Sequence, residues 1–225
     1  IYSSYNIAFD PDDSNTFYIG TWFEGIYKIS GTECVGHYTS LNSPLSKDWA
    51  MAVPNIVFDR DGNLWIAHAG DVGVSMLPKA TSSGPIVITN PDHVFSDSFR
   101  CTRIKIARND GTDNADYLLQ NINITDIFVD GANRKWIGTR ESGLYLVSAD
   151  GSEILNHFTA ENSKLPSNHV TEVIVDPVTG VAYIGTTSGL AAYRSDAVQS
   201  SDDYSNVYAF PNPVRPDYEG WISVT

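Results

Sequence analysis

The chain has 225 residues, of which 42% are hydrophobic and 12% aromatic, a composition typical of a globular protein. Its 27 acidic residues outnumber its 14 basic residues, and the formal net charge is −13. A surface with this charge repels phosphate backbones, anionic lipids and sulfated polysaccharides, so no nucleic acid partner is expected.

One pattern occurs four times along the chain. Each copy has an alternating hydrophobic stretch that ends in Asp, a polar turn, an aromatic-Ile-(Gly/Ala)-(Thr/His) segment, and a Gly that opens a second apolar stretch. The Asp residues lie about 49, 71 and 46 residues apart and are Asp10, Asp59, Asp130 and Asp176. This is the period at which propeller blades repeat, so the sequence predicts one repetitive β domain.

The alternation of apolar residues and the abundance of Val, Ile and Thr predict strands, and Asp, Gly and Asn in the turns predict hairpins. With a fourth strand near residues 34–39 and 154–159, each copy becomes a four-stranded antiparallel blade, which must stack on its neighbours to bury its faces. The fold class predicted is all-β, a partial β-propeller of about four blades. The blades are expected near residues 5–39, 53–106, 124–159 and 170–194.

Large aromatic residues stand at nearly the same place in every copy. They are Phe17 with Tyr18 beside it, Trp65, Trp136 and Tyr183. Because they recur in each copy, we expect them to pack blade against blade rather than to contact a ligand.

A longer stretch, residues 80–121, separates the second and third copies and contains strand-like pieces at 86–89 and 102–107. Its polar run 109–116 is rich in oxygen ligands but lacks the closing Glu of an EF-hand loop, so a loop and no metal are expected. Cys34 and Cys101 lack a CxxC context, and each fits a small buried thiol, although a disulfide between them stays open. No cofactor is expected.

The last copy ends at residue 194 without a fourth strand, which predicts an incomplete propeller within residues 1–194. Further blades or a second molecule would then lie against the open edge. Residues 195–206 have the composition of a linker. Residues 207–225 hold three prolines within residues 211–216, which predicts a rigid entrance to another β domain. We expect the chain to be part of a longer protein, because its first residues already resemble a strand.

The segments FTAENSKLPSNHVTEVIVD and WIGTRESGLYLV resemble the two-component regulator propeller repeat, known from the periplasmic sensor halves of hybrid histidine kinases in Bacteroidetes. Copies three and four match it well, whereas Ala67 and His68 replace Gly-Thr in copy two. The segments DGTDNADYLLQ, VDGANRKWIGT and YAFPNPVRPDYEG are similar to the C-terminal half of PorZ-like surface proteins of the type IX secretion system. This resemblance implies a periplasmic or cell-surface location and a sorting-type β-sandwich domain beginning in residues 207–225.

The resemblance also implies that the strand ending in Asp is the innermost of each blade. The loops on the opposite face of the disc would then display the candidate ligand-binding residues. These are Trp22, Phe23, Glu24, Trp49, His68, Asp71, Arg140, Glu141, Asn168 and His169. Exposed aromatic rings beside amides and carboxylates suit sugars, whose C–H faces stack while their hydroxyls form hydrogen bonds; packing at the rim is the alternative for the aromatic residues.

The sequence contains no GxSxG, HExxH or glycine-rich phosphate loop, so we expect a non-catalytic protein with no catalytic residues. Three functions stay open. The first is a surface-assembly module that binds a secretion component or a surface polysaccharide, which the Pro-Asn-Pro segment favours. The second is a periplasmic glycan sensor of a hybrid two-component system. The third is a glycan-active enzyme, which requires carboxylates that converge from separate blades.

Overall fold

The computed structural model describes residues 4–40, 43, 45, 52–69, 73–77, 102–108, 111–112, 114–198, 209–210 and 223–224. Every regular element in these ranges is a β-strand. A search of the same ranges finds no helix with the length and apolar character needed to span a membrane.

Four antiparallel sheets follow one another along the chain, and in each the strands pair in chain order. The first sheet contains β1 (Ser4–Phe9), β2 (Thr16–Thr21), β3 (Ile26–Ser30) and β4 (Glu33–Tyr38). The second contains β5 (Ile56–Phe58), β6 (Leu64–Ala67), β7 (Val74–Leu77) and β8 (Thr102–Arg103). The third contains β11 (Ile124–Val129), β12 (Lys135–Thr139), β13 (Leu144–Val147) and β14 (Ile154–Phe158). The fourth contains β15 (Val170–Val175), β16 (Val181–Thr186) and β17 (Gly189–Arg194).

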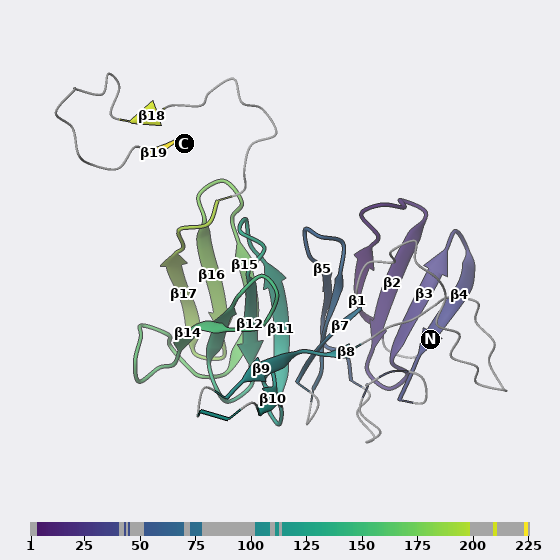
Figure 1. The fold of residues 1–225 in the computed structure, drawn as a ribbon, viewed down its shortest axis with the longest axis horizontal. Helices are drawn as coiled ribbons and strands as arrows, with labels where there is room; N and C mark the ends of the chain where they lie inside the picture. The colour runs from purple at the N-terminus through teal and green to yellow at the C-terminus, as the bar shows by residue number, and fades with distance from the viewer. Residues whose placement is uncertain are drawn as a thin grey trace.

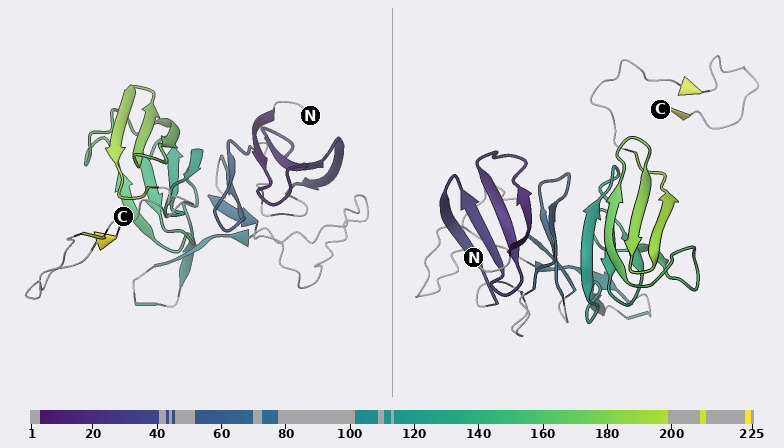
Figure 2. Two further views of the ribbon diagram at one scale, coloured as in Figure 1. Left: turned by 90° about the horizontal axis from the view of Figure 1, so that it is seen from above. Right: turned by 180° about the vertical axis from the view of Figure 1, so that it is seen from behind.

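The sheets lie side by side in chain order, from purple through teal to yellow-green in Figures 1 and 2. Their first strands pack against one another, β1 on β5, β5 on β11 and β11 on β15. The strand that ends in Asp is therefore innermost in each sheet. These features confirm the partial β-propeller, and the four sheets are called blades 1 to 4 below.

Blades 2 and 3 share a spacing of six residues between Asp and Trp, and this spacing has a structural cause. The Asp59 carboxylate accepts two backbone amides of its own hairpin turn and the Trp65 indole N–H, at 2.6 Å. Asp130 does the same in blade 3, where the Trp136 indole N–H lies 3.1 Å away. One carboxylate thus closes the hairpin and fixes the orientation of the large side chain on the next strand.

Tyr18, Trp65 and Trp136 pack between blades, as predicted, whereas Tyr183 of blade 4 is 41% exposed. Trp65 is fully buried and belongs to a core with Ile124 and Ile127 of blade 3, and Trp136 is buried against Val173 of blade 4. The strand register shows which residues are equivalent, because each stands opposite the same inner-strand position. They are Tyr18, Trp65, Trp136 and Tyr183, whereas Phe17 pairs with Phe9 on the other face of its sheet.

A buried ion pair joins blades 2 and 3. The Lys135 ammonium lies 3.3 Å from the Asp59 carboxylate and 4.2 Å from the Trp65 ring, and it donates to the carbonyls of Asn133 and Ala149. Burial raises the pKa of Asp59, but hydrogen bonds from Asn63 and Trp65 together with the Lys135 charge outweigh it and hold the pKa below its usual value.

Outside these blades, β9 (Lys105–Ala107) pairs with β10 (Ala115–Tyr117), and β18 (Ala209–Phe210) pairs with β19 (Ser223–Val224). The predicted strand at 86–89 and Cys101 lie outside the described residues. Cys34 is exposed and free, so the expectation of a buried thiol was wrong for this residue: it lies on the outermost strand of blade 1, where none of the described sheets covers it.

Candidate functional site

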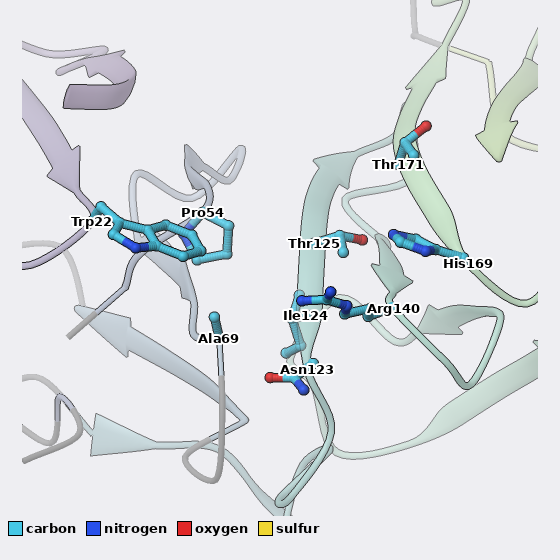
Figure 3. Close-up of a pocket in the computed structure, with 9 residues that line it drawn as sticks. All are labelled: Trp22, Pro54, Ala69, Asn123, Ile124, Thr125, Arg140, His169 and Thr171. Carbon is cyan, nitrogen blue, oxygen red and sulfur yellow. The ribbon is translucent and has the colours of Figure 1, made fainter. Parts of the chain in front are cut away.

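A cavity of about 280 Å³ opens where loops of all four blades meet. Blade 1 contributes Trp22, blade 2 contributes residues just before β5 and just after β6, and blades 3 and 4 contribute the starts of β11 and β15 and the loop after β12 (Figure 3). The lining residues are Trp22, Pro54, Ala69, Asn123, Ile124, Thr125, Arg140, His169 and Thr171. We call this cavity the axial pocket, since its walls include the innermost strands.

In blades 1 and 3, a threonine at the end of the second strand forms the hydrogen bonds that hold the following loop, and this loop carries one pocket residue. The Thr21 hydroxyl donates to the Gly25 carbonyl at 2.8 Å and accepts the Glu24 amide, and Thr139 makes the equivalent bonds to Gly143 and Ser142. The residue that directly follows the threonine projects into the pocket. It is Trp22 in blade 1 and Arg140 in blade 3, and Ala69 takes the same place after His68 in blade 2.

The inner strands supply a second repeated position. Pro54, Thr125 and Thr171 each stand two residues before the large apolar residue that fills the interface with the preceding blade. The Thr125 hydroxyl donates to the Val170 carbonyl at 2.8 Å, which joins blades 3 and 4 at the pocket wall. The pocket is therefore made of equivalent positions that differ in chemistry from blade to blade.

The two sides of the pocket differ in polarity. Trp22 and Pro54 form an apolar side, and Arg140, His169 and the two threonines lie across from them (Figure 3). Arg140 is exposed, and within the described ranges no residue forms a hydrogen bond or an ion pair with its guanidinium group. An aromatic plane facing several hydrogen-bond donors can hold a sugar ring by its C–H face and by its hydroxyls.

Three of the ten candidate ligand residues line this pocket, namely Trp22, Arg140 and His169. Phe23 is exposed next to Trp22, with ring centroids 6.1 Å apart and planes at 87°, and Glu141 is exposed beside Arg140. Neither is among the lining residues. Trp49 and Asp71 lie outside the described residues.

Two further candidates hold loops in place. The Glu24 carboxylate accepts the Tyr27 hydroxyl at 3.3 Å, and its carbonyl contacts the His37 imidazole at 2.7 Å. The Asn168 amide donates to the Glu161 carboxylate and accepts the Ala160 backbone amide at 2.8 Å. The Glu24 side chain is engaged within blade 1 and the Asn168 side chain within the loop that joins blades 3 and 4, and neither lines the pocket.

His68 is buried in blade 2, where its Nε2 lies 3.0 Å from the Ser75 hydroxyl. Burial, with a smaller contribution from the Arg103 charge, lowers the pKa of His68 to about 3, so the ring is neutral at physiological pH. It takes the place that threonine has in the other blades and does not reach the pocket.

The residues that the sequence did not identify are Pro54, Asn123, Thr125 and Thr171, together with Ala69 and Ile124. The described residues contain no group of three or more His, Cys, Asp or Glu side chains arranged to hold a metal ion. None of the described lining residues carries a carboxylate.

No protein-family model matches the chain, and no curated protein matches it. The chain does match solved structures. PorZ, an essential bacterial surface component of the type IX secretion system of Porphyromonas gingivalis, is 21% identical with a TM-score of 0.43, over 98% of this chain and 43% of PorZ. The extracellular domain of BT3049 of B. thetaiotaomicron, assigned to the hybrid two-component systems, is 18% identical with a TM-score of 0.55, over 87% of this chain and 22% of that one.

The β-propeller domain of Cps50 (Swd1) from Myceliophteria thermophila is 8% identical, with a TM-score of 0.54 over 84% of this chain and 50% of that one. The chain thus spans less than half the length of PorZ and BT3049. Both protein groups that the sequence pointed to are found among its structural neighbours. The likeness to the two structures with TM-scores above 0.5, the BT3049 domain and the Cps50 propeller, shows the β-propeller fold.

Proposed function

We propose that this chain is a non-catalytic recognition module of an extracytoplasmic Bacteroidetes protein, and that its axial pocket binds a surface polysaccharide. The observation that carries the proposal is the convergence of all four blades on one pocket, with Trp22 facing Arg140 and the threonine hydroxyls. A ring that stacks on Trp22 would place its hydroxyls within reach of the opposite side. The assignment to a surface-assembly protein rests on the Pro-Asn-Pro segment at residues 211–213.

The pocket lining supports binding rather than catalysis. Glycoside hydrolysis in most families uses a pair of carboxylates that flank the scissile bond, and the described lining residues include neither Asp nor Glu. Prolonged incubation of the chain with a glycan that it binds should release no sugar. Hydrolysis that is abolished by changing a pocket residue would contradict this part of the proposal.

The experiment is a glycan-array screen with the wild type, Trp22→Ala and Phe9→Ala. Phe9 is an exposed aromatic residue at the Asp end of β1, away from the pocket loops, and therefore controls for the general loss of a surface ring. Trp22→Ala should weaken binding by about tenfold, the size of one lost stacking contact, and Phe9→Ala should leave binding unchanged. If no glycan binds, the polysaccharide assignment fails.

A periplasmic glycan sensor is the second candidate, because the extracellular domain of BT3049 shares this fold at a TM-score of 0.55. Both functions use the same pocket, so the pocket variants do not separate them. The sequence of the full-length gene does: a kinase core in the same polypeptide establishes the sensor, and a sorting-type β-sandwich establishes the surface protein.

A further inference from the structure

Blades 1 and 3 share a stacked pair of rings on their two outer strands. In blade 1, Tyr27 of β3 stands directly opposite His37 of β4, and the ring centroids are 4.1 Å apart with planes at 7°. In blade 3, Tyr145 of β13 stands opposite His157 of β14, with centroids 4.0 Å apart and planes at 9°. The strand register places the two pairs at equivalent positions of their blades.

Each of these histidines holds the loop that follows the second strand of its blade. The His37 Nε2 lies 2.7 Å from the Glu24 carbonyl oxygen, and the His157 Nε2 lies 2.6 Å from the Ser142 carbonyl oxygen. A carbonyl oxygen only accepts hydrogen bonds, so Nε2 carries a proton and donates it in both blades. The stacked tyrosine ring fixes the orientation of the imidazole, and the imidazole fixes the carbonyl.

The same loop residue is also held through its backbone amide. The Glu24 amide donates to the Thr21 hydroxyl at 3.0 Å, and the Ser142 amide donates to the Thr139 hydroxyl at 2.9 Å. One residue of each loop is therefore fixed through its N–H by the second strand and through its C=O by the fourth strand. We call this arrangement of threonine, tyrosine and histidine the loop clamp.

The loop clamp occurs in the blades that bring a large side chain to the axial pocket. Trp22 and Arg140 each stand two residues before the clamped residue, inside the clamped loop. In blade 2 the register places Ser75 at the position of the tyrosine and Arg103 at that of the histidine. This blade contributes only the small side chain of Ala69 at the equivalent pocket position.

Blade 4 leads to the same correlation. Ala191 takes the position of the tyrosine, and the sheet has three strands in the described part of the chain, so the position of the histidine is not filled there. Thr187, which follows the threonine that ends β16, is not among the described residues that line the pocket. The loop clamp and a large pocket side chain thus occur together in blades 1 and 3 and are both missing from blades 2 and 4 as the structure describes them.

We propose that His37 and His157 are positioning residues of the axial pocket, which hold Trp22 and Arg140 where they would contact a ligand. This inference rests on the proposed glycan site. A side chain carried by an unfixed loop loses conformational freedom when a ligand binds, and this loss weakens binding. The loop clamp fixes the two loops in advance and avoids that cost.

Substitutions of His157 separate its two contacts. His157→Phe keeps a ring to stack on Tyr145 but removes the N–H donor, whereas His157→Gln removes the ring and keeps an N–H at the position of Nε2. Asn156→Ala is the matched control, because Asn156 is exposed on the same strand and its side chain lies on the opposite face of the sheet. His157 is exposed as well, so all three variants should unfold at the wild-type temperature, and a thermal melt verifies this.

Two measurements are made on each variant. The first is hydrogen exchange of the Ser142 amide by NMR, which needs no ligand, and the second is the affinity for the array glycan that the wild type binds most tightly. His157→Phe should accelerate the exchange and weaken glycan binding, each by about fivefold, which corresponds to ~1 kcal/mol for one lost hydrogen bond. His157→Gln and Asn156→Ala should match the wild type in both measurements.

Unchanged exchange of the Ser142 amide in His157→Phe would overturn the proposal, whether or not a glycan binds. Faster exchange with unchanged glycan affinity would overturn the positioning role, because the loop would then be held without consequence for the pocket. If no array glycan binds the wild type, the proposed function fails, and the exchange of the Ser142 amide then supports or overturns the loop clamp alone.

Discussion

The buried pair of Lys135 and Asp59 allows a quantitative test of the contact between blades 2 and 3. Their side chains are 0% and 2% exposed, and the 3.3 Å separation corresponds to a gross attraction of about 5 kcal/mol at an effective dielectric constant of about 20. Desolvation offsets most of this attraction, but removal of one partner leaves a buried charge and costs roughly 3 to 5 kcal/mol.

We expect Lys135→Met and Asp59→Asn each to lower the free energy of unfolding by about 3 kcal/mol. In Lys135→Met, Asp59 still accepts hydrogen bonds from the Trp65 indole and two backbone amides. In Asp59→Asn, Lys135 still donates hydrogen bonds to two carbonyls. Each loss should therefore lie at the lower end of that range. The double variant should lose at least ~1.5 kcal/mol less than the sum of the two, because the second change removes the orphaned charge.

Urea unfolding at pH 7, followed by tryptophan fluorescence, measures all four free energies. The exposed pair of Arg108 and Asp116 provides the control cycle, since its side chains are 46% and 52% exposed and should show no coupling above the error of the measurement. If the losses in the buried cycle add to within ~0.5 kcal/mol, the two charges do not interact across the interface and the reasoning is refuted.

Two further predictions concern pH and backbone conformation. The pKa of His68 is about 3 in the folded chain and about 6.5 in the unfolded chain, so only the unfolded state takes up a proton as the pH falls from 7 to 5. His68→Gln should therefore lose about 2 kcal/mol less stability than the wild type between pH 7 and pH 5. Equal losses in urea titrations would contradict the burial of a neutral ring. Gly143 and Gly111 both have positive φ, but an added Cβ would lie 2.1 Å from the Phe158 carbonyl oxygen at Gly143 and would meet nothing within 4 Å at Gly111. In the same urea assay, Gly143→Ala should therefore lower the free energy of unfolding by on the order of 3 kcal/mol and Gly111→Ala by about 1 kcal/mol. Similar losses for the two variants would show that the close approach at Gly143 is absent.

Much of the fold could be predicted from the sequence because its signals are local. The alternation of apolar residues and the Asp-to-Trp spacing act within one hairpin, and they correctly placed the inner strands, and Trp65 and Trp136 between blades. The equivalence of Tyr18 rather than Phe17 with Trp65 was missed, because it depends on the strand register and adjacent aromatic residues give no sign of it. The side-chain hydrogen bonds from Asn6 to Asn55 and from Asn55 to Asp126 were missed for a related reason, since both asparagines resemble the solvent-facing half of an alternating strand.

The candidate site was only partly predictable. Trp22 and Arg140 follow a Thr that ends a strand, and this local signal placed them at the pocket. Thr125 and Thr171 line the pocket only because neighbouring blades bring their inner strands together, which the sequence of one blade does not specify. His68 was predicted to face a ligand, yet the pocket position in blade 2 belongs to the residue after it.

The central claim is that a glycan binds where the four blades meet. A crystal structure of the chain soaked with the best-binding oligosaccharide from the array tests it most directly. We predict electron density for a sugar ring stacked on Trp22, with its hydroxyls directed toward Arg140 and Thr171. Density for the sugar on any other face, with the axial pocket holding only water, would contradict the account.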